Sequence, residues 1–123
     1  MKFDVSIPIY LQIKEEIENA IITSSLKEEE SIPSIRTMAQ EYRLNPQTVA
    51  NAVSELMNEG IIFKKRGIGM FVEKGAQNKL RQRKNQEFRS DELLKIIGKS
   101  KSLGISKNEL IEMISSLYHE GGE

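Results

Sequence analysis

Residues 34–60, SIRTMAQEYRLNPQTVANAVSELMNEG, decide the fold because they hold two helical patterns separated by a tight turn. In the first pattern, four apolar residues at i, i+3, i+4 and i+7 share one side of a helix: Ile35, Met38, Ala39 and Tyr42. Ser34 directly before them suits the N-cap, where its hydroxyl accepts a backbone N–H. This half is therefore predicted to be a short helix with Arg36 on its exposed side.

The second half of the stretch predicts another helix. Asn45 suits its N-cap and Pro46 its first helical position. Its apolar side is formed by four residues: Val49, Val53, Leu56 and Met57. Only Arg43 and Leu44 lie between the two helices, which is too short for anything but a helix-turn-helix corner.

The exposed side of the second helix begins with uncharged polar residues and becomes acidic toward its end. Its uncharged members are Gln47, Asn51, Ser54 and Asn58. Glu55 and Glu59 would repel phosphates, so only the first two turns are expected to enter a DNA groove. The N-terminal residues of the second helix contact base edges in DNA-binding helix-turn-helix proteins. A polar surface that contacts only water is the alternative, and the pattern alone leaves both open.

Length and charge limit the class of protein. A chain of 123 residues suits one domain, or a small domain with an appendage, and disfavours a large enzyme core. Basic and acidic residues balance at 18 each, but residues 61–84 hold eight basic residues against one acidic. This basic segment directly follows the helix pair and favours an anionic partner there.

Several kinds of chemistry lack the residues they need. The sequence has no cysteine, which excludes disulfides and thiol chemistry and permits a reducing compartment. The single histidine, His119, has no partner for a metal site or a nucleophile–base pair. No apolar run approaches the ~18 residues of a membrane span, and the N-terminus lacks the apolar core of a signal peptide. We therefore expect a cytoplasmic protein with no catalytic residues, metal, cofactor or membrane association.

A helix is predicted before the central stretch and a β-hairpin after it. Residues 8 to about 24 carry an apolar helical stripe that should pack across the helix pair: Tyr10, Ile13, Ile17, Ala20 and Ile21. Residues 26–33 are expected to form a loop whose acidic side chains are merely solvated. Residues 61–65 and 70–73 are β-prone and flank a glycine-containing turn.

The tip of the predicted hairpin is basic, with Lys64, Lys65 and Arg66. Helix, helix-turn-helix and basic hairpin is the element order of a winged-helix domain, in which the hairpin is the wing. Basic hairpin tips also serve solubility, but the clustering of like charge after this helix pair favours contact with DNA.

The remainder of the chain predicts two amphipathic helices. The first runs from Asn78 to about Ser102 with a moderately regular apolar stripe: Leu80, Phe88, Leu94 and Ile97. The second begins with a capping box of Ser106 and Glu109 and has a wide apolar face: Leu110, Ile111, Met113, Ile114, Leu117 and Tyr118. So short a tail cannot bury both faces on itself, so we expect a homodimer, with packing onto the winged domain as the alternative.

A basic patch opens this tail. It consists of Lys79, Arg81, Arg83 and Lys84. These side chains either touch backbone phosphates or form a solvated face, and the sequence does not favour one reading over the other.

Four segments carry a resemblance to a known family: IPSIR at 32–36, NPQTV at 45–49, Leu56 with EGI at 59–61, and GIGMFV at 67–72. These resemble the GntR family of bacterial transcription regulators, and PIYLQI at 8–13 is similar to the first helix of its YtrA-like branch. The resemblance implies a mainly α fold with a small β-hairpin. A winged helix-turn-helix domain, residues 1–75, would be followed by a two-helix dimerisation tail, residues 76–123.

The resemblance also implies roles for individual residues. By position, Arg36 would contact a base in the major groove, while Gln47 and Thr48 would approach a base or a phosphate. Arg66 with Gly67 would enter the minor groove. The predicted DNA-binding residues are Ser34, Arg36, Asn45, Gln47, Thr48, Asn51, Lys64, Lys65, Arg66 and Gly67. The predicted dimerisation residues are Phe88, Leu94, Ile97, Leu110, Ile111, Met113, Ile114, Leu117 and Tyr118.

Three positions depart from the family pattern. Pro46 stands where many members have Arg, which removes one base or phosphate contact, although Pro suits the YtrA-like branch. Arg43 stands where Gly is frequent in the turn, and a left-handed conformation there would cost roughly 1–2 kcal/mol. Residues 28 and 29 are both Glu, where Pro-Gly is usual.

The sequence thus predicts a sequence-specific transcription regulator, a repressor, that binds a palindromic operator in double-stranded DNA as a homodimer. The sequence does not identify a small-molecule effector, and no stretch of it suggests a pocket that would bind one. The alternative is a winged-helix protein-interaction module without specific DNA binding, and an enzyme is a distant third.

Overall fold

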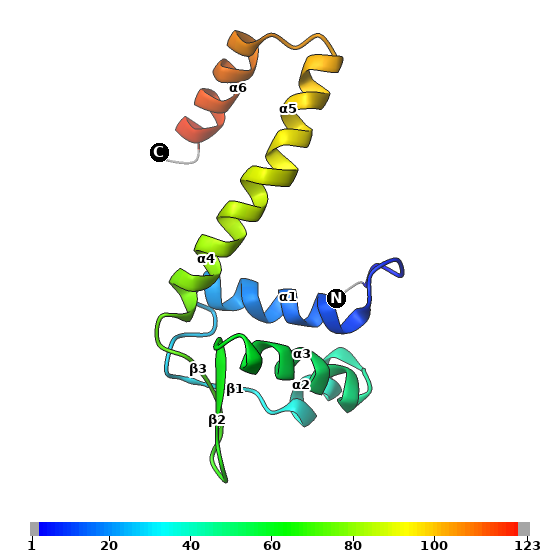
Figure 1. Ribbon diagram of the computed structural model, residues 1–123, viewed down its shortest axis with the longest axis vertical. Coiled ribbons are helices and arrows are strands. Elements are labelled where there is room, and N and C mark those ends of the chain that lie inside the picture. The colour runs from blue at the N-terminus through cyan, green and yellow to red at the C-terminus, as the bar shows by residue number, and fades with distance from the viewer. Residues whose placement is uncertain (1–2, 121–123) are drawn as a thin grey trace. The chain divides into compact units, whose positions relative to one another are not determined.

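The computed structural model describes residues 3–120 and divides the chain into two compact units, Met1–Gln82 and Arg83–Glu123. The first unit holds three helices, a small sheet and the start of a fourth helix, and the second holds the rest of the helical tail (Figure 1). The fold is mainly helical with one small antiparallel sheet, as the sequence predicted.

Three helices enclose the core of the first unit: α1 (Ile9–Ile22), α2 (Ile35–Tyr42) and α3 (Pro46–Asn58). In Figure 1, α1 lies along α3, against which α2 also packs. The apolar stripes that the sequence predicted meet in this core, with Ile13, Ile17 and Val49 all buried. Burying a side chain of this size contributes about 1.5–3 kcal/mol. Leu56 at the centre is fully buried, and its truncation to Ala would cost about 2–5 kcal/mol.

Both N-caps of the helix pair are confirmed. The Ser34 hydroxyl accepts the backbone N–H of Thr37 at 3.1 Å, and Asn45 Oδ1 accepts that of Gln47 at 2.8 Å. Pro46 occupies the start of α3 as expected. Each cap satisfies a backbone donor that the helix itself leaves unpaired, which fixes where the two helices begin.

The corner between the helices depends on Arg43, which adopts the left-handed conformation with φ 55° and ψ 49°. The Leu44 N–H donates to the Ala39 carbonyl at 2.9 Å, which closes the end of α2. A residue with a Cβ pays roughly 1–2 kcal/mol for this conformation. At the end of α3 the equivalent position is a glycine, Gly60, with φ 74°.

The sheet has three strands in the order β1-β3-β2: β1 (Ser31–Ile32), β2 (Ile62–Lys65) and β3 (Gly69–Val72). The hairpin of β2 and β3 is confirmed, with Phe63 opposite Phe71. The expectation of an irregular loop over residues 26–33 was wrong at β1, where Ser31 and Ile32 pair with β3. A two-residue strand is too short to show an alternating pattern, and its pairing depends on the distant β3.

Helix α4 (Ala76–Glu87) begins two residues before the predicted start at Asn78. Its first turns belong to the core of the first unit, where Ala76 and Leu80 are buried. The prediction that Leu80 belongs to the apolar stripe of the tail was therefore wrong. The acidic loop is also not merely solvated, because Glu28 Oε2 accepts the backbone N–H of Gln77 at 3.0 Å. Hydrogen bonds from the amides of Gly75 and Gln77 hold the pKa of Glu28 below its usual value.

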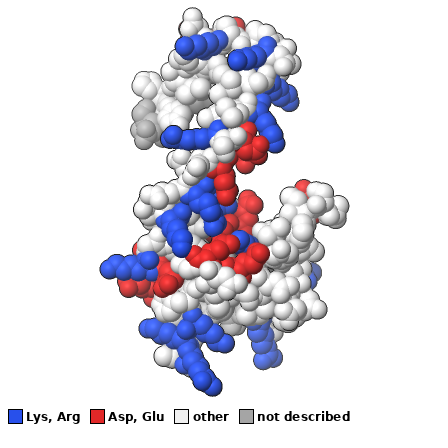
Figure 2. Space-filling model, viewed as in Figure 1, with Lys and Arg blue, Asp and Glu red and all other residues white. Residues whose placement is uncertain are grey.

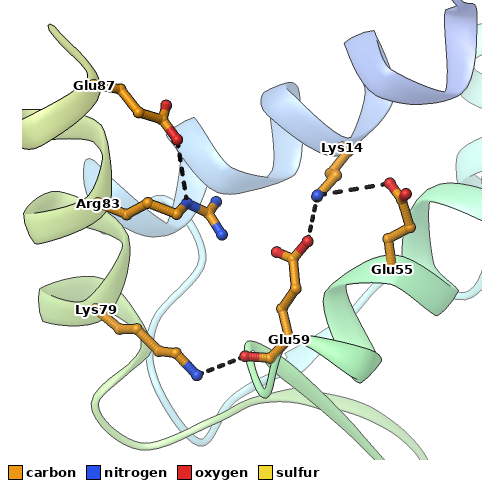
Figure 3. Close-up of polar contacts among 6 residues, drawn as sticks. All are labelled: Lys14, Glu55, Glu59, Lys79, Arg83 and Glu87. Atoms are coloured by element: carbon orange, nitrogen blue, oxygen red, sulfur yellow. Dashed lines mark hydrogen bonds and ion pairs between the residues drawn. The ribbon is translucent and has the colours of Figure 1, made fainter. Parts of the chain in front are cut away.

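Side chains of α4 bond to the ends of two other helices. Lys79 Nζ donates to the Glu59 carbonyl oxygen at 2.6 Å, at the end of α3 (Figure 3). An Arg81 amino group donates to the Ile22 carbonyl at 3.2 Å, at the end of α1. Cations at helix C-termini are stabilising because the carbonyls there carry partial negative charge. These contacts give two members of the predicted basic patch a structural role.

The second unit contains a π-helical turn (Phe88–Glu92), α5 (Leu93–Ser102) and α6 (Lys107–Glu120). The long helix expected from Asn78 to Ser102 is therefore three consecutive helical segments, because the π turn interrupts the α pattern. The capping box is confirmed. The Glu109 N–H donates to Ser106 Oγ at 3.1 Å, and the Ser106 N–H donates to Glu109 Oε1 at 3.2 Å.

Candidate nucleic-acid interface

The first turns of α3 present uncharged amides to solvent. Gln47 and Asn51 are exposed and bonded to each other, with Gln47 Nε2 donating to Asn51 Oδ1 at 3.0 Å. Thr48 lies between them in sequence and is half-buried, and Asn45 is exposed but occupied by its capping bond. The end of α3 that would enter a groove thus carries hydrogen-bonding groups without negative charge.

The start of α2 carries Ser34 and Arg36, both exposed. Ser34 is committed to the cap, because its hydroxyl also donates to Thr37 Oγ1 at 2.9 Å. Within residues 3–120, Arg36 forms neither an ion pair nor a side-chain hydrogen bond. Its guanidinium is therefore available for a partner, and α2 packs against α3, which carries the amides.

The wing carries the predicted basic residues at its exposed tip: Lys64, Lys65, Arg66 and Gly67. Lys and Arg side chains crowd the free end of the hairpin in Figure 2, while acidic side chains in that view lie nearer α1. Gly67 has φ 78°, a conformation that only glycine adopts without strain. Ile68 follows at the tip and is 74% exposed, and it is a wing residue absent from the predicted DNA-binding residues.

The basic residues of the wing do not all have the same surroundings. The Phe63 and Phe71 rings stack with centroids 5.6 Å apart on the outer face of the sheet. Lys65 Nζ lies 5.1 Å from the centroid of Phe71, so its ammonium is held over an aromatic ring. Lys64 is exposed at the neighbouring position of the strand, and no ring contact involves it among the described residues.

Lys14 of α1 partly offsets the charge at the acidic end of α3. Lys14 Nζ donates to Glu59 Oε2 and lies 3.6 Å from Glu55 Oε2, as Figure 3 shows. Burial lowers the pKa of Lys14, but the hydrogen bond to Glu59 and the charges of Glu59, Glu55 and Glu18 outweigh it, so this pKa lies above its ordinary value. The expected repulsion of phosphates by Glu55 and Glu59 is therefore reduced. Lys14 was not among the residues predicted from the sequence, because nothing in its position on α1 shows which helix it faces.

The candidate residues come from three elements of the first unit, and only some of them contact each other. The hydrogen bond between Gln47 and Asn51 joins two of them directly. Among residues 3–120, no hydrogen bond or ion pair joins the wing tip to the exposed start of α2 or α3. Their joint engagement of DNA therefore stays a prediction.

Apolar side chains remain exposed throughout the second unit. The predicted dimerisation residues that are exposed are Phe88, Leu94, Ile97, Ile111, Met113, Ile114, Leu117 and Tyr118, and Leu110 is half-buried. An apolar pocket of about 320 Å³ lies between α5 and α6 and is lined by Ile97, Leu110 and Ile114 among others. This pocket could not be predicted from the sequence, because its walls come from two helices that meet only in the fold.

Residues 3–120 contain no group of three or more His, Cys, Asp or Glu side chains that could hold a metal ion. None of the helices in that range is both long enough and apolar enough to cross a membrane.

Comparison with protein families gives one match over residues 9–72, to the model described as bacterial regulatory proteins, gntR family. The matched residues include α1, the helix-turn-helix and the wing. The second unit lies beyond the matched residues.

Two curated relatives from Bacillus subtilis strain 168 match almost the whole chain. The uncharacterized HTH-type transcriptional regulator YhcF is 32% identical, with 98% of each chain covered. The HTH-type transcriptional repressor YtrA is 30% identical over 91% of this chain and 85% of its own. The similarity to these relatives thus extends through the second unit.

Solved structures agree with the fold. A transcriptional regulator from Oenococcus oeni superposes with a TM-score of 0.77 at 26% identity, covering 96% of this chain and 97% of that one. The DNA-binding domain of AraR, in complex with operator ORX1, has a TM-score of 0.52 at 29% identity and covers 54% of this chain and 80% of that one.

Proposed function

The chain belongs to the GntR family of bacterial regulatory proteins, and on that premise we propose that it is a repressor that binds a palindromic operator as a homodimer. It is a transcription regulator with an N-terminal winged helix-turn-helix DNA-binding domain, and it is not an enzyme. Repression is supported by relatives such as YtrA, which is described as a transcriptional repressor. Exclusion of polymerase from a promoter is the mechanism we propose.

One observation carries the DNA-binding part of this proposal. The exposed first turns of α3 hold only uncharged hydrogen-bonding groups, and the acidic residues at its other end are paired with Lys14. This is the charge arrangement that allows the N-terminal end of a helix to approach base edges between two phosphate backbones. The AraR DNA-binding domain, to which this chain is similar, is itself bound to an operator, which supports the same role.

The proposed contacts divide between the two grooves. Arg36 suits guanine, whose O6 and N7 accept two N–H bonds from one guanidinium. Gln47 and Asn51 suit adenine. Thr48, the residue after Gln47, is expected to contact a base or a phosphate. A second group of contacts comes from the exposed wing: Lys64, Lys65, Arg66 and Gly67. A narrow minor groove has an enhanced negative potential, which attracts Arg66.

Dimerisation is supported by the exposed apolar residues of the second unit. The helices of the second unit expose large apolar side chains along their length, and contiguous exposed apolar surface marks an interaction site. A second copy of the chain would cover that surface and also place two winged units on two half-sites, which gives the operator its twofold symmetry. Such an assembly acts in the cytoplasm, where bacterial DNA is.

Control by a signal follows from the same arrangement. A signal that binds one spacing of the two winged units more tightly than another would shift the protein toward or away from the operator-binding form. The signal need not be a small molecule bound directly, and no cofactor is required.

The salt dependence of binding to duplex DNA tests the proposal against a winged-helix protein-docking module. If a dimer neutralises roughly 6–10 phosphates, affinity falls about 10³- to 10⁵-fold between 50 and 200 mM salt. The measurement is a fluorescence titration of a labelled duplex selected by the full chain, with an unrelated duplex as control. A flat salt response, or equal affinity for both duplexes, would support the docking module instead.

A further inference from the structure

Two exposed amide side chains on α3 are bonded to each other. Gln47 Nε2 donates to Asn51 Oδ1 at 3.0 Å, across one helical turn. Neither side chain is packed into the core, because both residues are exposed. A pair of this kind contributes only about 0.2–0.5 kcal/mol to helix stability. Folding alone therefore gives little reason for the two amides to occupy this position.

The bond determines what the pair offers to a ligand. It uses one of the two Gln47 Nε2–H donors and one lone pair of Asn51 Oδ1, so the Gln47 carbonyl stays free as an acceptor and the Asn51 amino group keeps both of its donors. Turning both amides over would leave the same two functions with their owners exchanged. The pair also restricts both side chains before binding, which reduces the entropy lost when a partner arrives.

One acceptor beside one donor matches the major-groove edge of adenine, which presents N6–H as a donor and N7 as an acceptor. We propose that Gln47 and Asn51 act together on a single A·T base pair, the carbonyl accepting from N6 and the amino group donating to N7. This inference rests on the proposed function and names the base that α3 recognises.

The edge of guanine fits the pair less well. Guanine presents two acceptors, N7 and O6, so the free carbonyl of the pair would face an acceptor without a hydrogen bond. Leaving a polar group unpaired on binding is costly. Arg36 on α2 has only donors and suits guanine, so the two helices divide the bases between them by hydrogen-bonding type.

Selection from a randomised duplex library tests the inference with the full-length chain. The proteins are the unaltered chain, Gln47→Ala, Asn51→Ala and the double variant. Asn58→Ala is the matched control, because it removes an exposed amide from the same helix beyond its first two turns. We expect both single variants to lose the preference for adenine at the same position and to keep the other preferences. Asn58→Ala keeps them all.

Affinities for the selected duplex sharpen the test. Replacing that adenine by a purine without the N6 amino group, or by 7-deaza-adenine, should weaken the unaltered chain about 5- to 150-fold. The same replacements should leave the affinity of either variant unchanged. The double variant should lose no more than either single variant, because one recognition event is lost in all three. Thermal melting of all variants should match the unaltered chain.

The outcomes separate this inference from the function on which it rests. Relaxation of two different positions by the two single variants, or of a shared G·C position, would overturn the recognition of adenine by the pair while leaving operator binding intact. If the unaltered chain enriches no duplex at all, the proposed function fails, and the inference fails with it.

Discussion

The Lys14 ammonium on α1 donates a hydrogen bond to the Glu59 carboxylate at the end of α3, and this contact joins the two helices beside the acidic end of α3. Lys14 is largely covered, with 16% of its side chain exposed, and has Glu55 as a second partner. We expect Lys14→Met to lower the free energy of unfolding by about 1–2 kcal/mol. Urea denaturation measures this loss. Lys27→Met, which removes an exposed lysine from a loop, should change the stability by less than about 0.5 kcal/mol.

The same contact gives this prediction a pH dependence. The pKa of Lys14 is raised on folding, so its stabilising effect is complete below the range in which an unfolded lysine titrates, about pH 10.4. It is lost as the pH rises through the folded pKa. The stabilities of the unaltered chain and Lys14→Met should therefore converge above that range. Two curves that stay parallel across it would show that Lys14 acts only through packing.

Replacing Arg43 by Gly should stabilise the first unit. Arg43 has φ 55°, and Gly would remove the Cβ strain while adding freedom to the unfolded chain, so we expect a net gain of about 0.5–1 kcal/mol. Arg43→Ala keeps the Cβ and should give no such gain. Chemical denaturation distinguishes the two variants, and equal stabilities would mean that backbone strain at this corner is negligible.

Replacing Arg36 by Ala should weaken binding to the cognate duplex by roughly 1–3 kcal/mol and relax the preference at one guanine. Arg36→Lys keeps the charge but loses the planar two-bond contact, so it should recover affinity without recovering the preference. Competition titration with cognate and scrambled duplexes measures both effects. An equal loss on the two duplexes would make Arg36 a phosphate contact.

The three basic residues of the wing should differ in their effects on DNA binding. Lys64→Ala and Arg66→Ala should each lower the salt slope by about 1. Lys65→Ala should change the slope less, because its ammonium lies over the Phe71 ring, and should instead cost about 0.5–1 kcal/mol of stability. Salt titrations and thermal melts of the three variants provide the comparison. If Lys65→Ala also lowers the salt slope by about 1, its ammonium leaves the Phe71 ring to contact a phosphate in the complex.

Charges placed on α6 should prevent dimerisation. Leu110→Asp with Ile114→Asp puts two carboxylates on the apolar face of α6 and should give monomers, as measured by light scattering of the full chain. Asn108→Asp adds a charge to the same helix at an exposed polar position and should leave the mass unchanged. If the double variant keeps the mass of the unaltered chain, the proposed dimer surface is wrong.

Features encoded within a few residues could be predicted from the sequence. The caps at Ser34 and Asn45 and the capping box of Ser106 and Glu109 all depend on neighbours in the chain, and each is confirmed.

Features that depend on distant partners could not be predicted. The strand β1 exists because β3 pairs with it, and Glu28 caps a helix 49 residues away. Lys14 faces an acidic pair that lies on another helix. The hydrogen bond between Gln47 and Asn51 joins near neighbours, but spacing alone does not show which way each amide turns.

The burial of Leu80 and Ala76 determines how this protein can be shortened. Both residues lie beyond the wing, yet they fill space among the helices of the first unit. A DNA-binding fragment cut at residue 75 would therefore expose an apolar cavity and lose Lys79 from the end of α3. An autonomous fragment has to retain the chain through Gln82, the last residue of that compact unit.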